Sequence, residues 1–144
     1  MDGLFTVFVL NLLLVAVAVV VHYEFLYRAS QLADSLRMRH RSRVLLGVVS
    51  ALTAHSVEIW VFGIGYWLAE HQLGLGALQG RHDGSLLDSV YFSFTTFSTL
   101  GYGDVEPVGP LRFTAGIEAL AGLVLITWSA SFLFIEMQRY WKKE

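Results

Sequence analysis

Three long apolar segments limit what this chain can fold into more than any other feature of its sequence. They cover residues 4–27, 44–69 and 111–135 of the 144 residues. A run of about 20 apolar residues is long enough to cross the hydrocarbon layer of a membrane as a helix. The sequence therefore predicts an all-α membrane protein with three transmembrane helices. The first is apolar on all sides, so we expect it at the lipid-facing periphery.

The positions of Lys and Arg give these helices a direction. Of the ten such residues, five lie between the first two segments and three follow the third, so that only Arg81 and Arg112 lie elsewhere. Basic residues gather on the cytoplasmic side of membrane proteins. We therefore expect a multi-pass protein of the plasma (inner) membrane, with the N-terminus outside and both the connector 28–43 and the short tail 136–144 in the cytoplasm.

A shorter segment between the second and third spans follows a different pattern. Ser85 and Asp88 have the spacing of a capping box at the start of a helix over residues 86–98. Such a helix is about 20 Å long, which is too short to cross the membrane. We expect a re-entrant helix that is buried in protein and preceded by a glycine-rich outer loop over residues 70–85.

The stretch Thr99-Leu100-Gly101-Tyr102-Gly103-Asp104 follows this short helix directly. Glycine readily adopts left-handed backbone conformations, so the two glycines allow successive carbonyls to point to the same side. A row of carbonyls is a ladder of cation ligands, and the Thr99 hydroxyl adds one more oxygen at the inner end. The sequence predicts a cation-coordinating loop here.

This stretch closely resembles the pore signature of potassium channels, Thr-Val-Gly-Tyr-Gly-Asp, with Leu100 in place of the valine. The resemblance covers residues 44–135. It implies that the carbonyls of Thr99, Leu100, Gly101 and Tyr102 coordinate K⁺ as the permeant ion, with no other cofactor. The fold it implies has these parts: outer helix 44–69, turret 70–85, pore helix 86–98, selectivity filter 99–104 and inner helix 111–135.

One filter strand cannot surround an ion, so a ring needs several chains, and closed cyclic symmetry is the usual solution. The resemblance implies four chains, a tetrameric potassium-channel-like pore and passive K⁺ conduction. A non-selective cation channel is an alternative, because the side chain of Leu100 is bulkier than valine and must pack behind the filter. The intramembrane acids Glu58 and Glu118 leave open a non-conducting membrane sensor or assembly that kept the pore fold.

Three further residues have roles that depend on the resemblance. Gly103 and Asp104 support the filter, and Asp104 either ties it to the pore helix or concentrates cations at its mouth. Gly122 lies about twenty residues after the filter, where potassium channels carry a hinge glycine. The alternative is a packing glycine in a face of small residues, namely Ala115, Ala119, Gly122, Ser129 and Ala130.

The second span carries a stripe of small residues that lets another helix approach closely in lipid. At helical spacing the stripe consists of Gly47, Ala51, Ala54, Glu58, Gly65 and Ala69. His55 lies three residues before Glu58, so the two side chains can meet. We expect this pair to face the third or the first span, either as a polar clasp between helices or as a group whose protonation biases the pore.

The connector 28–43 has an apolar repeat, formed by Ala29, Leu32, Ala33 and Leu36. It predicts either a short helix at the bilayer surface or a solvated loop. In the first case the basic side chains would contact anionic lipid heads. These side chains are Arg37, Arg39, Arg41 and Arg43.

Composition argues against other classes of protein. The chain has no cysteine, which excludes disulfides and thiolate metal sites. The net charge of −2 argues against nucleic acid as a partner. The sequence shows no nucleophile–base set, no glycine-rich phosphate loop and no zinc-type cluster, so we do not expect an enzyme.

Overall fold

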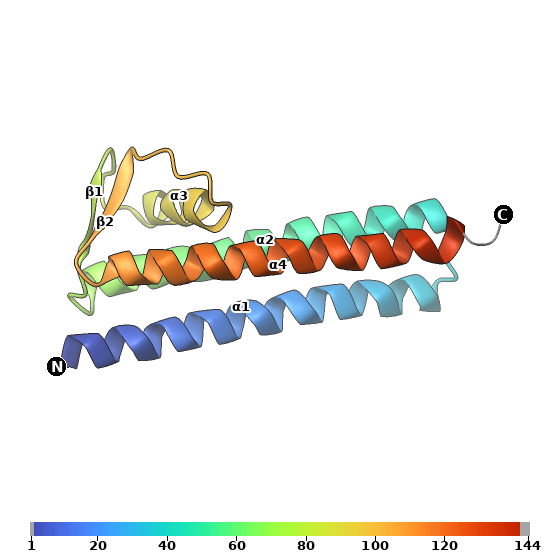
Figure 1. Cartoon of the computed structure of the whole chain (residues 1–144), viewed down its shortest axis with the longest axis horizontal. Helices are drawn as coiled ribbons and strands as arrows, with labels where there is room; N and C mark the ends of the chain where they lie inside the picture. The colour runs from blue at the N-terminus through green and yellow to red at the C-terminus, as the bar shows by residue number, and fades with distance from the viewer. Residues whose placement is uncertain (1, 142–144) are drawn as a thin grey trace.

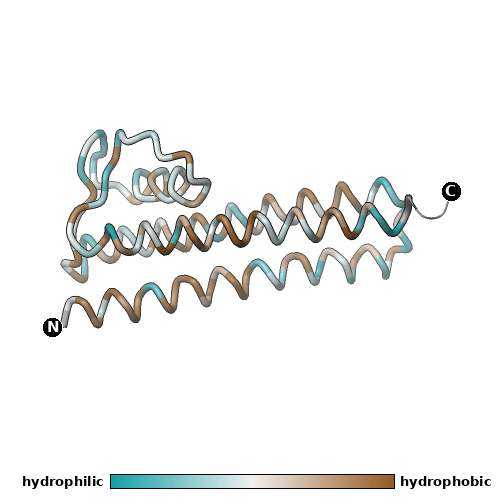
Figure 2. Tube along the Cα trace, in the orientation of Figure 1, coloured by the Kyte–Doolittle hydropathy of each residue, from teal (hydrophilic) through white to brown (hydrophobic). Residues whose placement is uncertain are grey.

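The computed structural model describes residues 2–141 and contains three long helices that lie side by side (Figure 1). They are α1 (Asp2–Ser35), α2 (His40–His71) and α4 (Leu111–Trp141). Each contains a segment long and apolar enough to cross a membrane, and hydrophobic residues run along the middle of all three (Figure 2). The predicted all-α fold with three membrane spans is confirmed.

The short helix α3 (Leu86–Phe97) lies on the side of α2 and α4 that faces away from α1 (Figure 1). The Ser85 hydroxyl accepts a hydrogen bond from the backbone N–H of Asp88 at 3.1 Å, so the predicted cap is present. The N-terminus lies at the same end of the molecule as α3, whereas the α1–α2 connection and the end of α4 lie at the opposite end. The helices therefore alternate in direction as the sequence predicted.

The outer loop and the segment after the filter pair as a small hairpin, which the sequence analysis did not predict. Strand β1 (Ala77–Gly80) lies antiparallel to β2 (Val105–Val108). Gly76 and Gly80 have positive φ, and a Cβ at either would lie 2.2 Å from a carbonyl oxygen of the opposite segment. This close backbone approach, available only to glycine, fixes the outer loop to the segment that follows the filter.

The boundaries predicted for the connector 28–43 were wrong. Helix α1 continues through Ser35 and α2 starts at His40, so residues 28–43 contain no separate surface helix. Ala29 and Ala33 are buried and extend the inner face of α1, whereas Leu32 and Leu36 are exposed. The predicted tail 136–144 is likewise helical as far as Trp141, and residues 142–144 lie outside the described part of the chain.

The helices pack through the faces that small residues occupy. All six members of the predicted α2 stripe are buried, which confirms that prediction. The predicted α4 face was wrong at Ala130, which is exposed, while Gly122 and Ser129 are buried. Helix α1 has exposed apolar side chains along its outer side, but it also buries two polar side chains, Asn11 and His22.

Candidate functional site

In the loop after α3, residues with positive φ alternate with residues whose φ is not positive. Thr99, Gly101 and Gly103 have φ values of 59°, 52° and 76°, whereas Leu100 and Tyr102 between them do not have positive φ. Glycine adopts positive φ without strain, but a β-branched threonine does so rarely. Thr99 is therefore a backbone outlier, and it lies close to two glycines that were predicted to be left-handed. Because such outliers cluster at functional sites, this loop is the candidate functional site.

Hydrogen bonds hold this loop against α3. The N–H of Gly101 donates to the carbonyl of Thr95 at 3.0 Å. At the outer end the Tyr91 hydroxyl donates to Oδ2 of Asp104 at 2.8 Å, and this bond raises the pKa of Tyr91 above its ordinary value. Asp104 is therefore tied to the short helix, which is the anchoring arrangement that the sequence left as one of two alternatives.

The loop is open on one side. The side chains of Leu100 and Tyr102 are 57% and 67% exposed. A Cβ placed at Gly101 or Gly103 meets no atom within 4 Å. The side chain of Leu100 was expected to pack behind the filter. Its exposure shows that this packing does not form within one chain.

Gly122 of α4 packs against the C-terminal end of α3. A Cβ there would be 2.1 Å from the carbonyl oxygen of Phe97, the last residue of α3. A larger residue at position 122 would collide with this carbonyl, so close packing explains the glycine. The hinge role is not tested by the structure and stays a prediction.

A first buried carboxyl group, that of Glu118, links α4 to α2 and α3. The Tyr66 hydroxyl donates to Oε2 of Glu118 at 2.5 Å. The Ser93 hydroxyl lies 2.5 Å from Oε1 of Glu118 and 2.8 Å from the carbonyl oxygen of Ile59. A hydroxyl has one proton, so the two acceptors around Ser93 are satisfied together only if Glu118 carries a proton itself. Neutral Glu118 thus completes a chain of hydrogen bonds with no buried charge.

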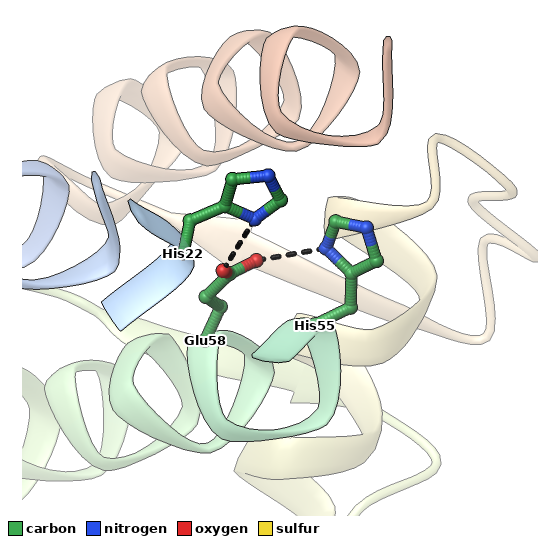
Figure 3. A group of neighbouring side chains, drawn as sticks. All are labelled: His22, His55 and Glu58. Atoms are coloured by element: carbon green, nitrogen blue, oxygen red, sulfur yellow. Dashed lines mark hydrogen bonds and ion pairs between the residues drawn. The ribbon is translucent and has the colours of Figure 1, made fainter. Parts of the chain in front are cut away.

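A second buried carboxyl group, that of Glu58, lies between two imidazole rings (Figure 3). Nδ1 of His22 lies 2.9 Å from Oε1, and Nδ1 of His55 lies 2.8 Å from Oε2. On the far side of the rings, Oγ of Ser129 lies 3.0 Å from Nε2 of His55 and 3.5 Å from Nε2 of His22. The predicted pair of His55 and Glu58 therefore meets, and it faces both the first and the third span.

His22 is the functional candidate that sequence reasoning missed. It lies 36 positions before Glu58, and a lone histidine in an apolar segment gives no periodic signal. The sequence showed no zinc-type cluster, but the fold brings His22, His55 and Glu58 together so that atoms able to ligate a metal lie within 4.8 Å of one another. The only sign of this cluster in the sequence was that the first apolar segment contains a histidine, His22.

Charged residues tie the three helices together at the end opposite α3. Arg43 is 9% exposed and donates to Asp34 of α1 at 2.6 Å and to Glu136 of α4 at 3.4 Å. The prediction that Arg43 contacts lipid was therefore wrong, because its charge is matched inside the protein. Arg37, Arg39 and Arg41 are exposed.

Comparison with known proteins was made against families, curated proteins and solved structures. Residues 48–139 match a family described as "Ion channel", which is not a class of enzymes. The chain is 35% identical over 63 residues to an inward rectifier potassium channel, Kirbac3.1, of Paramagnetospirillum magnetotacticum. It is 31% identical over 70 residues to an uncharacterized protein of Methanothermus fervidus.

These similarities cover part of each protein. The matched region is 43% of this chain and 21% of the inward rectifier, and it is 45% of this chain and 11% of the second relative. No solved structure gives a significant match.

Proposed function

The chain belongs to the ion-channel family and is a membrane protein, and we propose from this premise that four copies form a pore that conducts K⁺ passively. The observation that carries the proposal is the loop of residues 99–104. Its alternating positive φ values occur at Thr99, Gly101 and Gly103, at the positions where the potassium-channel signature was recognised. The carbonyls of Thr99, Leu100, Gly101 and Tyr102, with the Thr99 hydroxyl, would coordinate the ion.

The exposure of the loop supports an assembly of several chains. Leu100 and Tyr102 in the loop are exposed, and Phe94 of α3 is 56% exposed. Because a single strand offers ligands from one side only, a ring of copies around a shared axis would complete the coordination shell. We propose the homotetramer as the functional unit, with α4 innermost and α1 outermost.

Selectivity for K⁺ is the finer part of the proposal. The similarity to a protein named as a potassium channel and the glycine pattern support it. The alternative of a non-selective cation channel rests on Leu100, whose side chain would have to be packed by neighbouring copies. The alternative of a non-conducting assembly loses much of its support, since Glu58 and Glu118 both have hydrogen-bonding partners inside the chain.

The orientation and the lipid contacts belong to the same proposal. The N-terminus and the filter would face outward from the plasma (inner) membrane, and the α1–α2 connection would face the cytoplasm. Arg37, Arg39 and Arg41 would then lie where anionic headgroups gather.

A flux assay with a mass measurement tests the proposal. Purified protein is placed in lipid vesicles loaded with K⁺ or Na⁺, and ion efflux is followed after an opposing gradient is applied. We expect efflux of K⁺ well above that of Na⁺, and a particle mass in detergent equal to four chains. Efflux of both ions at similar rates would favour the non-selective alternative, whereas no efflux from a tetramer would favour the non-conducting one.

A further inference from the structure

We propose that His22, His55 and Glu58 form an intramembrane binding site for a divalent transition-metal ion of the zinc class. Ser129 would orient the two imidazole rings. The proposal is independent of the permeant ion, because it rests on side chains of α1, α2 and α4 rather than on the filter backbone.

The donor set is the first reason. Among residues 2–141, this is the one group of three or more His, Cys, Asp or Glu side chains whose ligating atoms converge. His22 and Glu58 are fully buried, and the His55 side chain is 16% exposed. Imidazole nitrogens with one carboxylate suit zinc and neighbouring transition metals, whereas magnesium and calcium prefer oxygen ligands alone.

The geometry is the second reason. Both rings turn Nδ1 toward the same carboxylate, one ring to each oxygen, at 2.9 and 2.8 Å (Figure 3). Zinc holds nitrogen and oxygen donors at about 2.0–2.2 Å, which separates neighbouring donors by about 3.3 Å in a tetrahedron. Each nitrogen–oxygen pair needs to spread by only about half an ångström, which ring and carboxylate rotations can supply. Glu58 would contribute one or both oxygens.

The position of Ser129 is the third reason. An imidazole that binds a metal through Nδ1 carries its proton on Nε2, and that N–H needs an acceptor. The Ser129 oxygen lies at hydrogen-bonding distance from Nε2 of both rings. One hydroxyl oxygen can accept two hydrogen bonds but can donate only one. Ser129 is therefore placed to satisfy both rings at once in the tautomer that a bound metal requires.

Charge balance points the same way. With both rings neutral and no ion bound, an ionised Glu58 would be an uncompensated charge in a membrane span, which is costly. The two Nε2 atoms would then both be acceptors facing a single hydroxyl proton, so one would lack a partner. A divalent cation held by the carboxylate and both Nδ1 atoms gives both Nε2–H groups the Ser129 oxygen as acceptor, and a hydroxide as the fourth ligand would leave the site without net charge.

An ion bound here would join α1 to α2 and, through Ser129, to α4. His22 belongs to α1, while His55 and Glu58 belong to α2 and Ser129 belongs to α4. Of the three ligands, His55 has the ring that is partly exposed.

A cobalt titration tests the site. Full-length protein in detergent is treated with a chelator and then titrated with Co²⁺, whose visible absorption reports coordination by nitrogen and oxygen. We expect one Co²⁺ per chain with the intense bands of a four-coordinate site, and we expect Zn²⁺ to displace it. Zn²⁺ should also raise the unfolding temperature, since the ion binds only the folded site.

Matched variants assign the ligands. His22→Gln and His55→Gln should each weaken Co²⁺ binding by more than about 100-fold, and Ser129→Ala by about 10–100-fold, as expected for an orienting group. His71→Gln and Glu118→Gln are the controls, because they remove a histidine and a buried membrane acid outside the cluster. Both controls should bind Co²⁺ as the wild type does.

Two results would overturn the proposal. The first is wild-type uptake no greater than that of the doubly substituted His22→Gln/His55→Gln protein. If that protein does not fold, the second result decides: no rise in the unfolding temperature of the wild type with Zn²⁺, together with unchanged Co²⁺ affinity in Ser129→Ala. The cluster would then be a polar clasp between helices only.

Discussion

The candidate filter loop and the two buried carboxyl groups differ in where their polar atoms find partners. Glu58 and Glu118 find all their partners inside one chain, through two imidazoles in one case and two hydroxyls in the other. The loop of residues 99–104 leaves its open side to groups outside the chain. The difference indicates that the two clusters hold the helices of one chain together, and it supports the proposal that the loop is completed by other copies.

The two carboxyl groups also differ from each other. The hydroxyl partners of Glu118, one of which also contacts a backbone carbonyl, fit a neutral acid and offer no imidazole nitrogen. The imidazole partners of Glu58 offer nitrogen lone pairs or charges of their own. Two acids that look alike in the sequence therefore have different chemistry, which their neighbours determine.

The largest effect should come from Gly101→Ala, which alters the filter and leaves the clusters intact. Alanine at a left-handed position is strained by about 1–2 kcal/mol, and four copies in a ring would multiply the effect. We expect loss of K⁺-over-Na⁺ selectivity, measured as the ratio of efflux rates from vesicles. Thr99→Ala should be milder and weaken only the innermost ion site.

The control for this variant is the Co²⁺ titration described above. Normal Co²⁺ binding by Gly101→Ala would confirm that the subunit fold survives. Unchanged selectivity in Gly101→Ala would remove the filter assignment altogether.

A comparison of Glu118→Ala with Glu118→Gln tests the buried hydrogen-bond chain. Alanine leaves the Tyr66 hydroxyl without an acceptor and opens a cavity, which should cost about 2–5 kcal/mol of stability. Glutamine keeps one donor toward Ser93 and one acceptor toward Tyr66, as a neutral carboxylic acid does. Thermal unfolding should therefore show a large loss for alanine and a small one for glutamine, and equal losses would contradict the neutral hydrogen-bonded state of Glu118.

Gly122→Ala probes the contact between α4 and the end of α3, directly before the loop. The added Cβ would meet the backbone carbonyl of Phe97 at 2.1 Å, and backbone cannot rotate away as a side chain can. Overpacking of this kind costs about 1–3 kcal/mol. We expect lower stability and altered conduction together. Gly116→Ala, where a Cβ meets nothing within 4 Å, is the matched control on the same helix and should behave as the wild type.

The smallest effect concerns the loop that precedes α3. Hydrogen bonds from the side chain and backbone of Ser85 lower the pKa of Asp83 below its ordinary value. A carboxyl group with a lowered pKa stabilises the fold above the unfolded-state pKa of about 3.9, and this contribution disappears as the pH falls through the folded-state value. Asp83→Asn should thus reduce the unfolding temperature slightly near neutral pH and not at all in strong acid. An equal difference at both pH values would contradict this reading.

Much of the fold could be predicted because the signals were local. Apolar runs gave the three spans, the spacing of Ser85 and Asp88 gave the start of α3, and small residues gave the buried face of α2. The hairpin was missed because its strands are four residues each and are held by backbone approach at Gly76 and Gly80.

The candidate sites were predictable to different degrees for the same reason. The candidate filter loop is one continuous stretch, so a motif was sufficient to propose it. The cluster at Glu58 draws on three helices, and the pairing of His22 with residues of α2 follows from packing that no local pattern encodes. Helix ends were misplaced where buried alanines and the ion pairs of Arg43 extend α1 and α2 beyond their apolar cores.

The most direct test of the central claim is a single-channel recording of the purified wild-type protein in a planar bilayer, with K⁺ on one side and Na⁺ on the other. The account predicts unitary currents that reverse at a strongly displaced voltage, in the direction that K⁺ permeation alone produces. A reversal voltage near zero, or no current from a protein that assembles as a tetramer, would contradict it.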